Sequence, residues 1–170
     1  MEKHRDGIKT GGFEKFATAI TELLDAHGVP YRLLPHSAPV FTVAAAARQR
    51  GVVREEMVKS LLLRDKDRRY VLACVAGDAR LDTRALRAQL PAEWGRLRFA
   101  RPEEIEAVTG CVMGAVSPLG LPGDVPVIFD RAIAGCAREN ISSGDPLAGL
   151  ELDPADLIRL ARARLADIAK

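Results

Sequence analysis

The sequence has few cysteines and no long apolar run. Its three cysteines, Cys74, Cys111 and Cys136, are odd in number and widely spaced, and no CxxC pair occurs. A disulfide framework or a cysteine-based zinc site is therefore not expected. No stretch reaches the roughly 18 apolar residues that a membrane-spanning helix needs, and the charged start MEKHRDGIKT lacks the apolar core of a signal peptide. These absences predict a soluble, cytoplasmic protein with reduced thiols.

An excess of one charge sign is also lacking. The 25 Lys and Arg residues face 23 Asp and Glu residues, which leaves a net charge of +2. Binding of nucleic acid by bulk electrostatics alone is not expected, although a local basic patch stays compatible with the sequence. The phosphate-binding patterns GxxxxGK[ST] and GxGxxG do not occur. No His and Cys spacing is typical of a metal site, so we expect neither a metal nor a cofactor.

The residues of a nucleophilic hydrolase are not arranged as a triad. The three histidines are His4, His27 and His36, and His36 is adjacent to Ser37 without an aspartate nearby to orient it. Cys111 lies in a glycine-rich segment and would be a nucleophile only if a base reached it, whereas a small buried thiol is the simpler interpretation. A protein nucleophile is therefore not indicated.

The length of 170 residues, 48% of them hydrophobic, fits one domain with a sizeable core. We expect a flexible leader at 1–11 and a single α/β (α+β) domain at 12–170, with strands and helices interspersed around a central sheet. The segments expected as helices are 13–24 before a cap at Gly28, VAAAARQR between Thr42 and Gly51, LDTRALRAQL, PEEIEAV and the terminal LDPADLIRLARARLADIA. The segments expected as strands are VPYRLLPH, the two runs that flank RDKDRR, RLRFA and VPVIFD. RENISSG is interpreted as a turn.

Lys59 occupies an unusual place in the first strand of the expected hairpin, MVKSLLL. Because side chains alternate between the faces of a strand, Lys59 points the same way as Leu61 and Leu63. An ammonium group among apolar side chains needs either an escape to solvent at a sheet edge or a pocket that uses its charge. The strand pattern alone leaves both open.

The segment TGCVMGAVSPLGLPG, from Thr109 to Gly123, is rich in glycine. Such a composition suits a loop whose backbone comes close to something else. A purely structural loop and a loop that orients a small substrate or a water both fit. Taken alone, these residues do not identify a function.

A set of segments in a fixed order carries a resemblance to a known family. The segments are VKSLLLRDKDRRYVLACVAGDARLD, RFARPEEIEAVTG, GAVSPLG, VPVIFD, ISSG and LDPADLIRL. From about Phe13 to the C-terminus the chain resembles the YbaK-type aminoacyl-tRNA deacylase family, which includes trans-editing proteins and the editing domain of bacterial prolyl-tRNA synthetases. The resemblance implies a mixed, largely antiparallel and curved central sheet surrounded by helices.

The resemblance also implies roles for particular residues. The essential lysine of the family falls on Lys59, and the glycine of its loop, implied as catalytic, falls on Gly114. The positions implied to bind substrate are Ser60, Thr109, Gly110, Ala115, Val116, Ser117, Pro118, Ile141, Ser142, Ser143, Gly144 and His36. The chain departs from cysteine-specific relatives at Pro35 and Gly149, where they have a tyrosine and an aspartate, and from alanine-specific relatives at Ser60, where they have an asparagine.

The implied reaction is hydrolysis of the ester of a mischarged tRNA by a trans-editing deacylase. The residue removed would be of the Cys or Ala type, carried by proline tRNA, with prolyl-tRNA synthetase as a further partner. Such an ester is already activated, so positioning and charge stabilisation suffice without a triad, a metal or a cofactor. Lys59 would either anchor the phosphate of the terminal nucleotide or stabilise the developing negative charge. The alternative is a non-catalytic module that binds aminoacyl-adenosine or tRNA, or that docks on a synthetase.

Overall fold

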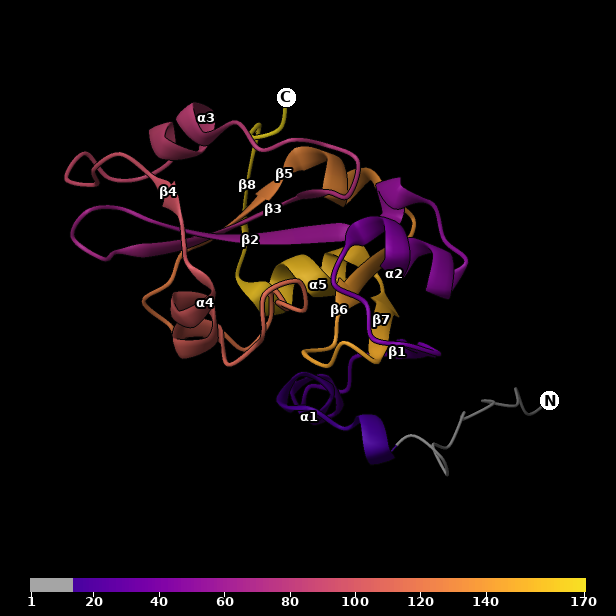
Figure 1. Ribbon diagram of the computed structural model, residues 1–170. Helices are drawn as coiled ribbons and strands as arrows, with labels where there is room; N and C mark the ends of the chain where they lie inside the picture. The colour runs from indigo at the N-terminus through magenta and orange to yellow at the C-terminus, as the bar shows by residue number, and fades with distance from the viewer. Residues whose placement is uncertain (1–13) are drawn as a thin grey trace.

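A computed structural model describes residues 14–170, so the expected leader 1–11 lies outside the described residues. The helices are α1 (Ala19–Ala26), α2 (Val43–Arg50), α3 (Thr83–Ala88), α4 (Pro102–Thr109) and α5 (Pro154–Ala161), with short 3-10 turns at Glu14–Phe16, Arg54–Glu56 and Arg131–Gly135. The strands are β1 (Tyr31–Pro35), β2 (Val58–Arg64), β3 (Tyr70–Ala76), β4 (Arg98–Phe99), β5 (Val127–Asp130), β6 (Glu139–Ser142), β7 (Ala148–Leu152) and β8 (Arg164–Ala166) (Figure 1). None of the helices described is long and apolar enough to cross a membrane.

The strands form two sheets. The larger sheet has the order β4-β2-β3-β5-β8, in which β3, β5 and β8 are parallel neighbours and the pairs β2–β3 and β2–β4 are antiparallel. The smaller sheet is antiparallel, with the order β1-β7-β6. One parallel bridge between Met57 and Asn140 links them. The expected mixed single-domain class is confirmed, but the strands divide between two sheets where we expected one.

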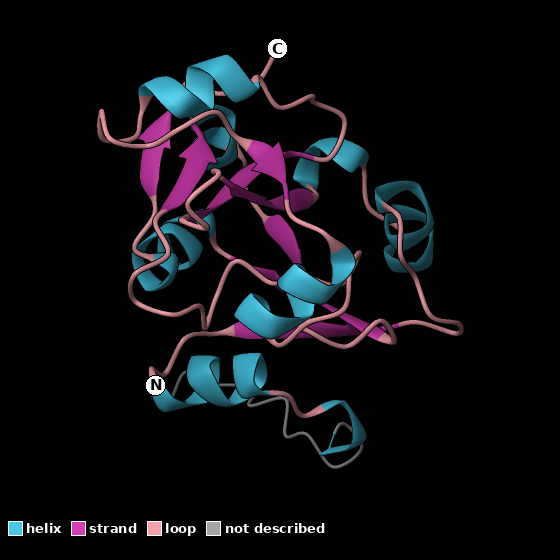
Figure 2. Cartoon of the chain, turned by 60° about the vertical axis from the view of Figure 1, so that its left-hand side comes forward, coloured by secondary structure: helices cyan, strands magenta, loops and turns pink. Residues whose placement is uncertain are grey.

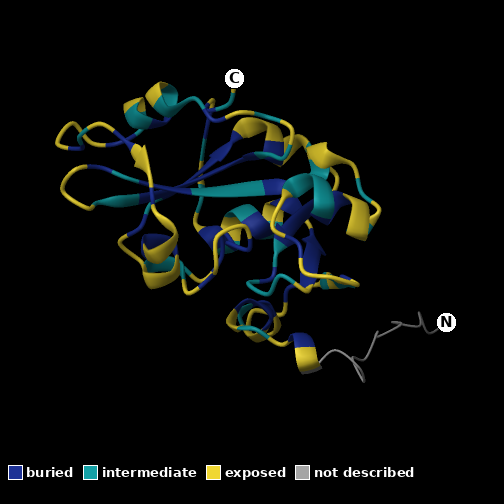
Figure 3. Cartoon of the chain, viewed as in Figure 1, coloured by how far each residue is buried: buried dark blue, intermediate teal, exposed yellow. Residues whose placement is uncertain are grey.

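The larger sheet is buried on both faces. Leu63, Val71 and Ala73 pack against Leu86 of α3 on one face. The opposite face, with Leu72 and Phe129, packs against α1, α4, α5 and the smaller sheet. Figure 2 shows helices on both sides of the strands. Figure 3 shows that β3 and β5 are mostly buried, that β2 is largely of intermediate burial and that the outer turns of the helices are exposed. This layering places β3 at the centre of the larger sheet and β2 next to it, beside the short strand β4.

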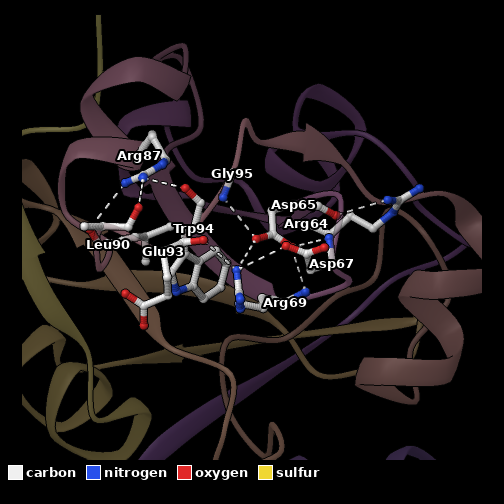
Figure 4. A network of polar contacts seen from close by, with 10 residues as sticks. Arg64, Asp65, Asp67, Arg69, Arg87, Leu90, Glu93, Trp94 and Gly95 are labelled. Carbon is white, nitrogen blue, oxygen red and sulfur yellow. Dashed lines mark hydrogen bonds and ion pairs between the residues drawn. The ribbon is translucent and has the colours of Figure 1, made fainter.

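The β2–β3 hairpin has the expected register. Lys59 pairs with Val75 and Leu63 pairs with Val71, so Lys59 lies on the α3 side of the sheet. The hairpin turn is held by the buried carboxylate of Asp65, which accepts hydrogen bonds from the backbone N–H groups of Asp67, Arg69 and Gly95 (Figure 4). The turn is thereby tied to the segment after α3.

The C-terminal third differs from the sequence-based expectation. The helix expected to run to the C-terminus ends at Ala161, where Arg162 takes a left-handed conformation (φ 50°). The chain then forms β8 beside β5. Strands β6 and β7 were not expected either, because nearly all their residues are buried and no polar alternation shows in the sequence.

Candidate functional site

A cavity of about 450 Å³ lies along the first half of β2. Strand β4 pairs only with Leu63 and Arg64, which leaves the edge of β2 before them without a neighbouring strand. The Leu62 carbonyl accepts a hydrogen bond from Ala100 N–H (2.9 Å) on this side. Because main-chain groups alternate along a strand, those of Ser60 point to the same open edge. The cavity is therefore lined by side chains of β2 and lies beside main-chain N–H and C=O groups of β2 that pair with no neighbouring strand.

Lys59 lines this cavity. Its Nζ donates a hydrogen bond of 2.6 Å to the carbonyl oxygen of Ala79. Burial lowers the pKa of the Lys59 ammonium, the charge of Asp78 opposes this shift, and that of Arg80 adds to it. The cavity lies at the part of the β2 edge that β4 does not cover, so Lys59 is both near a sheet edge and in the lining of a pocket. That the pocket uses its charge stays a prediction.

Two loops far apart in the sequence meet at the cavity. The Ser142 hydroxyl donates to the Ala115 carbonyl oxygen (2.7 Å) and accepts from Gly144 N–H (3.2 Å). Ala115, Val116 and Gly114 line the cavity with Ser142. The glycine-rich loop and the ISSG turn, which the resemblance assigned to one pocket, are thus in direct contact.

Gly114 has a conformation that only glycine adopts readily. Its φ is +88°, and a Cβ at this position would lie 2.7 Å from the carbonyl oxygen of Phe41. The glycine therefore allows the loop to approach the chain that leads into α2. That approach closes one wall of the cavity.

The other expected site residues lie behind the cavity wall. Thr109 and Gly110 end α4, where the Thr109 hydroxyl donates to the Ile105 carbonyl oxygen (2.7 Å). The Ser143 hydroxyl is buried and donates to the Ala148 carbonyl oxygen (2.7 Å). The residues assigned to the pocket by resemblance that do not line it are Thr109, Gly110, Ser117, Pro118, Ile141, Ser143 and Gly144. Their contacts hold the two loops in place.

His36 lines the cavity but both of its ring nitrogens are occupied. Nδ1 lies 2.8 Å from the Pro146 carbonyl oxygen and must donate to it. Nε2 therefore accepts the hydrogen bond of Arg50 Nε–H (3.1 Å). Burial lowers the pKa of His36, and the charge of Arg50 lowers it further, against the opposing effect of the Pro146 hydrogen bond and of Asp145. His36 is thus a neutral side chain that holds Arg50, with no free lone pair for a proton.

Several lining residues were missed by sequence reasoning. Arg50 was interpreted only as part of the end of a helix, yet it enters the cavity. Phe41, Phe99 and Met113 also line the cavity while their exposed fractions are 55%, 58% and 58%. No local sequence pattern predicts that these residues line the cavity, because they come from segments that are brought together only by the fold.

Other hydrolytic groups are not gathered at this site. Cys111 is a buried free thiol whose Sγ contacts the Thr109 carbonyl oxygen (3.6 Å), and it does not line the cavity. Among residues 14–170, no group of three or more His, Cys, Asp and Glu side chains is placed to hold a metal ion. The cavity therefore offers two cations, Lys59 and Arg50, one carboxylate, Asp145, together with hydroxyl and backbone groups.

Residues 37–160 match the aminoacyl-tRNA editing domain family. The chain belongs to this family. The resemblance to YbaK-type editing proteins is thereby confirmed, since the match includes the strand of Lys59 and both loops of the cavity.

The relatives of this editing domain include large proline–tRNA ligases and a deacylase of similar length to this chain. The proline–tRNA ligase of Geobacillus thermodenitrificans (strain NG80-2) is 38% identical over 93 residues, which are 55% of this chain and 16% of the ligase. The chain thus corresponds to a small part of that enzyme. The multifunctional Ser/Thr-tRNA deacylase ProXp-y of Escherichia coli (strain K12) is 28% identical over 154 residues, which are 87% of this chain and 89% of the deacylase.

Solved structures share the fold of this editing domain. The protein APE2540 superposes with a TM-score of 0.80 at 30% identity, over 89% of this chain and 99% of that chain. A protein described as a trans-editing enzyme for prolyl-tRNA synthetase superposes with a TM-score of 0.72 at 27% identity, over 91% of this chain and 99% of that chain. The expected editing-domain fold is confirmed.

Proposed function

We propose that this chain is a trans-acting aminoacyl-tRNA deacylase that hydrolyses the ester between a wrong, small amino acid and the 3′ ribose of tRNA. The observation that carries the proposal is that Lys59 lines a cavity that the Gly114–Val116 loop also lines. Membership of the editing family and the similarity to a Ser/Thr-tRNA deacylase support it. A docking surface alone would not need a cation in a cavity.

The proposed reaction is attack of water on the ester carbonyl carbon. The bond from that carbon to the ribose oxygen breaks, the ribose oxygen takes a proton, and free amino acid and tRNA leave. The Lys59 ammonium donates to the oxygen on which negative charge develops, and backbone groups of the Gly114–Val116 loop hold the aminoacyl group. Because the ester is activated, this positioning supplies the rate enhancement without a protein nucleophile.

The amino acid that fits this proposal is small, of the Cys or Ala type, and the tRNA is that for proline. Val58, Ala115 and Val116 line the same cavity as Lys59 and give it apolar walls that suit a small side chain. Size exclusion separates substrates by only about 1–3 kcal/mol per methylene, so several small residues compete. The Ser/Thr-tRNA deacylase relative adds Ser and Thr to the candidates, and the ligase relatives support prolyl-tRNA synthetase as a partner.

The test is deacylation of proline tRNA charged with Cys, Ala, Ser, Thr or Pro. We expect the wild type to hydrolyse one or more of the first four and to spare the correctly charged tRNA. Lys59→Ala should lower the rate on the order of a hundredfold, because one charged donor at the reacting oxygen is lost. Lys66→Ala removes an exposed lysine from the β2–β3 turn and should leave the rate unchanged.

The competing function is a non-catalytic module that binds aminoacyl-adenosine or docks on a synthetase. Folded wild type that hydrolyses none of the charged tRNAs, yet binds a non-hydrolysable aminoacyl-adenosine, would favour that module. Equal rates for Lys59→Ala and the wild type would contradict the proposed role of Lys59.

A further inference from the structure

Arg50 is a second cation in the cavity, and the proposed hydrolysis does not use it. It is in the last turn of α2 and lines the cavity. Burial lowers the pKa of its guanidinium to about 10, so the group still carries its charge at neutral pH. A desolvated charge is costly unless it has a partner of opposite sign.

Asp145 lines the same cavity, but among the described residues no carboxylate lies within ion-pair distance of Arg50. Its hydrogen bonds go to His36 Nε2 (3.1 Å) and to the Met57 sulfur (3.7 Å), which are both neutral. The ion pairs of the described chain involve other arginines, at positions 32, 64, 69, 101, 131 and 159. Most of the five N–H donors of the guanidinium therefore have no protein acceptor.

The surroundings hold this guanidinium in one orientation. His36 is fixed by Pro146, and its only free lone pair accepts Arg50 Nε–H. Gly149 of β7 lies against the guanidinium so closely that a Cβ there would overlap it. A histidine of fixed tautomer and a position without a side chain thus set the plane of the group. Of the terminal nitrogens, Nη1 contacts only the Met57 sulfur (3.7 Å), and Nη2 has no acceptor among the described residues.

We infer that Arg50 binds a phosphodiester of the acceptor end, oriented by His36 and Gly149. The inference rests on the proposed function, which brings the 3′ end of tRNA into the cavity. In that substrate the amino-acid carboxyl group is esterified, so the phosphodiesters are its anions next to the aminoacyl group. A planar fork of terminal N–H donors matches two phosphate oxygens, a geometry that a lysine ammonium does not offer. The cavity therefore has separate cations for the two parts of the substrate, Lys59 for the ester and Arg50 for the backbone.

Two non-hydrolysable probes test this inference. The first is 3′-alanylamino-adenosine, which has no phosphate. The second is its cytidylyl-(3′,5′) dinucleotide, which adds the terminal phosphodiester. Equilibrium binding is measured for wild type, Arg50→Gln and Arg48→Gln, the last being a matched loss of charge at an exposed position of the same helix. Binding needs no turnover, so the result does not depend on hydrolysis.

We expect Arg50→Gln to weaken binding of the dinucleotide probe roughly ten- to a hundredfold, since a charge-assisted contact is lost. Binding of the nucleoside probe should change by less than about twofold, which is the scatter expected of a distant surface substitution. Arg50→Lys should recover part of the affinity, and Arg48→Gln should bind both probes as the wild type does. Gly149→Ala should show the same dinucleotide-selective loss, because its Cβ displaces the guanidinium.

Each of the other possible binding results contradicts one part of the inference or of the proposed function. Equal losses for both probes would mean that Arg50 contacts the aminoacyl-adenosine part, and no loss for either would make Arg50 a structural residue. Wild-type affinity of Gly149→Ala for the dinucleotide would overturn the positioning role of Gly149. Failure of the folded wild type to bind either probe would overturn the proposed function together with the inference, whereas binding independent of Arg50 would overturn the inference alone.

Discussion

Asp65 shows how single buried polar groups support the hairpin that carries Lys59. Its Oδ1 accepts from Asp67 and Arg69 N–H, and its Oδ2 accepts from Gly95 N–H and from the Arg69 guanidinium (2.9 Å). Burial by itself would raise the pKa of Asp65. The hydrogen bonds from Gly95, Arg69 and Asp67 outweigh burial and lower this pKa to about 2.

Asp65→Asn should lower the free energy of unfolding by about 2 kcal/mol, because its amide group would face the donors of Gly95 and Arg69. The folded pKa lies below the ordinary 3.8, so the stability that the Asp65 carboxylate supplies is present above about pH 4 and is lost as the pH falls through about 2. Urea unfolding of wild type and Asp65→Asn at pH 7 and at pH 2 measures both effects.

Asp67→Asn is the control for this change. Asp67 is exposed and pairs with Arg69 at 3.6 Å, which contributes little in water. A stability gap between Asp65→Asn and the wild type that is as wide at pH 2 as at pH 7 would contradict the role given to the carboxylate charge.

At the scale of elements, the fit between the glycine-rich loop and the chain before α2 shapes the cavity. Gly114→Ala would combine a left-handed φ with overlap on the Phe41 backbone. We expect a loss of stability of about 1–3 kcal/mol from the strained backbone. We also expect deacylation to fall at least tenfold, because misplacement by about 1 Å is enough for that. Thermal unfolding and initial rates measure the two effects.

Gly123→Ala is the matched control in the same loop segment. Nothing lies within 4 Å of a Cβ built at Gly123, and its φ is not positive. Its stability should stay within about 0.5 kcal/mol of the wild type, with an unchanged rate. If both variants behave alike, the contact between Gly114 and Phe41 does not shape the site.

At the scale of the whole molecule, the buried Glu139 carboxyl group makes the free energy of unfolding depend on pH. It begins β6 and is fully buried, and neither of its carboxylate oxygens has a hydrogen-bond partner among the described residues. Burial raises its pKa to about 8, and the charge of Glu56 acts in the same direction, whereas Cys136 lowers it. The side chain is therefore mainly protonated at pH 7 in the folded chain.

Because this pKa lies above the ordinary 4.5, folding binds a proton between the two values. The corresponding stability is fully present below about pH 4.5 and is lost as the pH rises through about 8. Glu139→Gln keeps the shape without the titration, so it should gain stability relative to the wild type as the pH increases from 5 to 9. Urea unfolding across this range measures the difference.

Glu93→Gln, at an exposed position, should follow the wild type at every pH. A constant difference between Glu139→Gln and the wild type from pH 5 to pH 9 would show that Glu139 titrates normally in the folded chain.

Local sequence signals were sufficient to predict several helices and strands. Helix α2 begins after Thr42, whose hydroxyl accepts from Ala45 N–H (3.2 Å), and ends at Gly51 in a left-handed conformation, as the sequence predicted. The strands on either side of RDKDRR also formed as expected. By contrast β6, β7 and β8 are short, and their strand character depends on neighbours that no local pattern identifies.

The sequence by itself determined the order of the segments that match the editing family, and the strand that presents Lys59. Side-chain alternation and helix capping depend on residues only a few positions apart, so they can be recognised in the sequence without knowledge of the tertiary structure. Only the tertiary structure decided that Ser142 would bond to the loop of Ala115, 27 residues away, and that Arg50 would lie against Gly149 beside His36. Those contacts come from the pairing of sheets and the burial of side chains, which join segments that share no local signal.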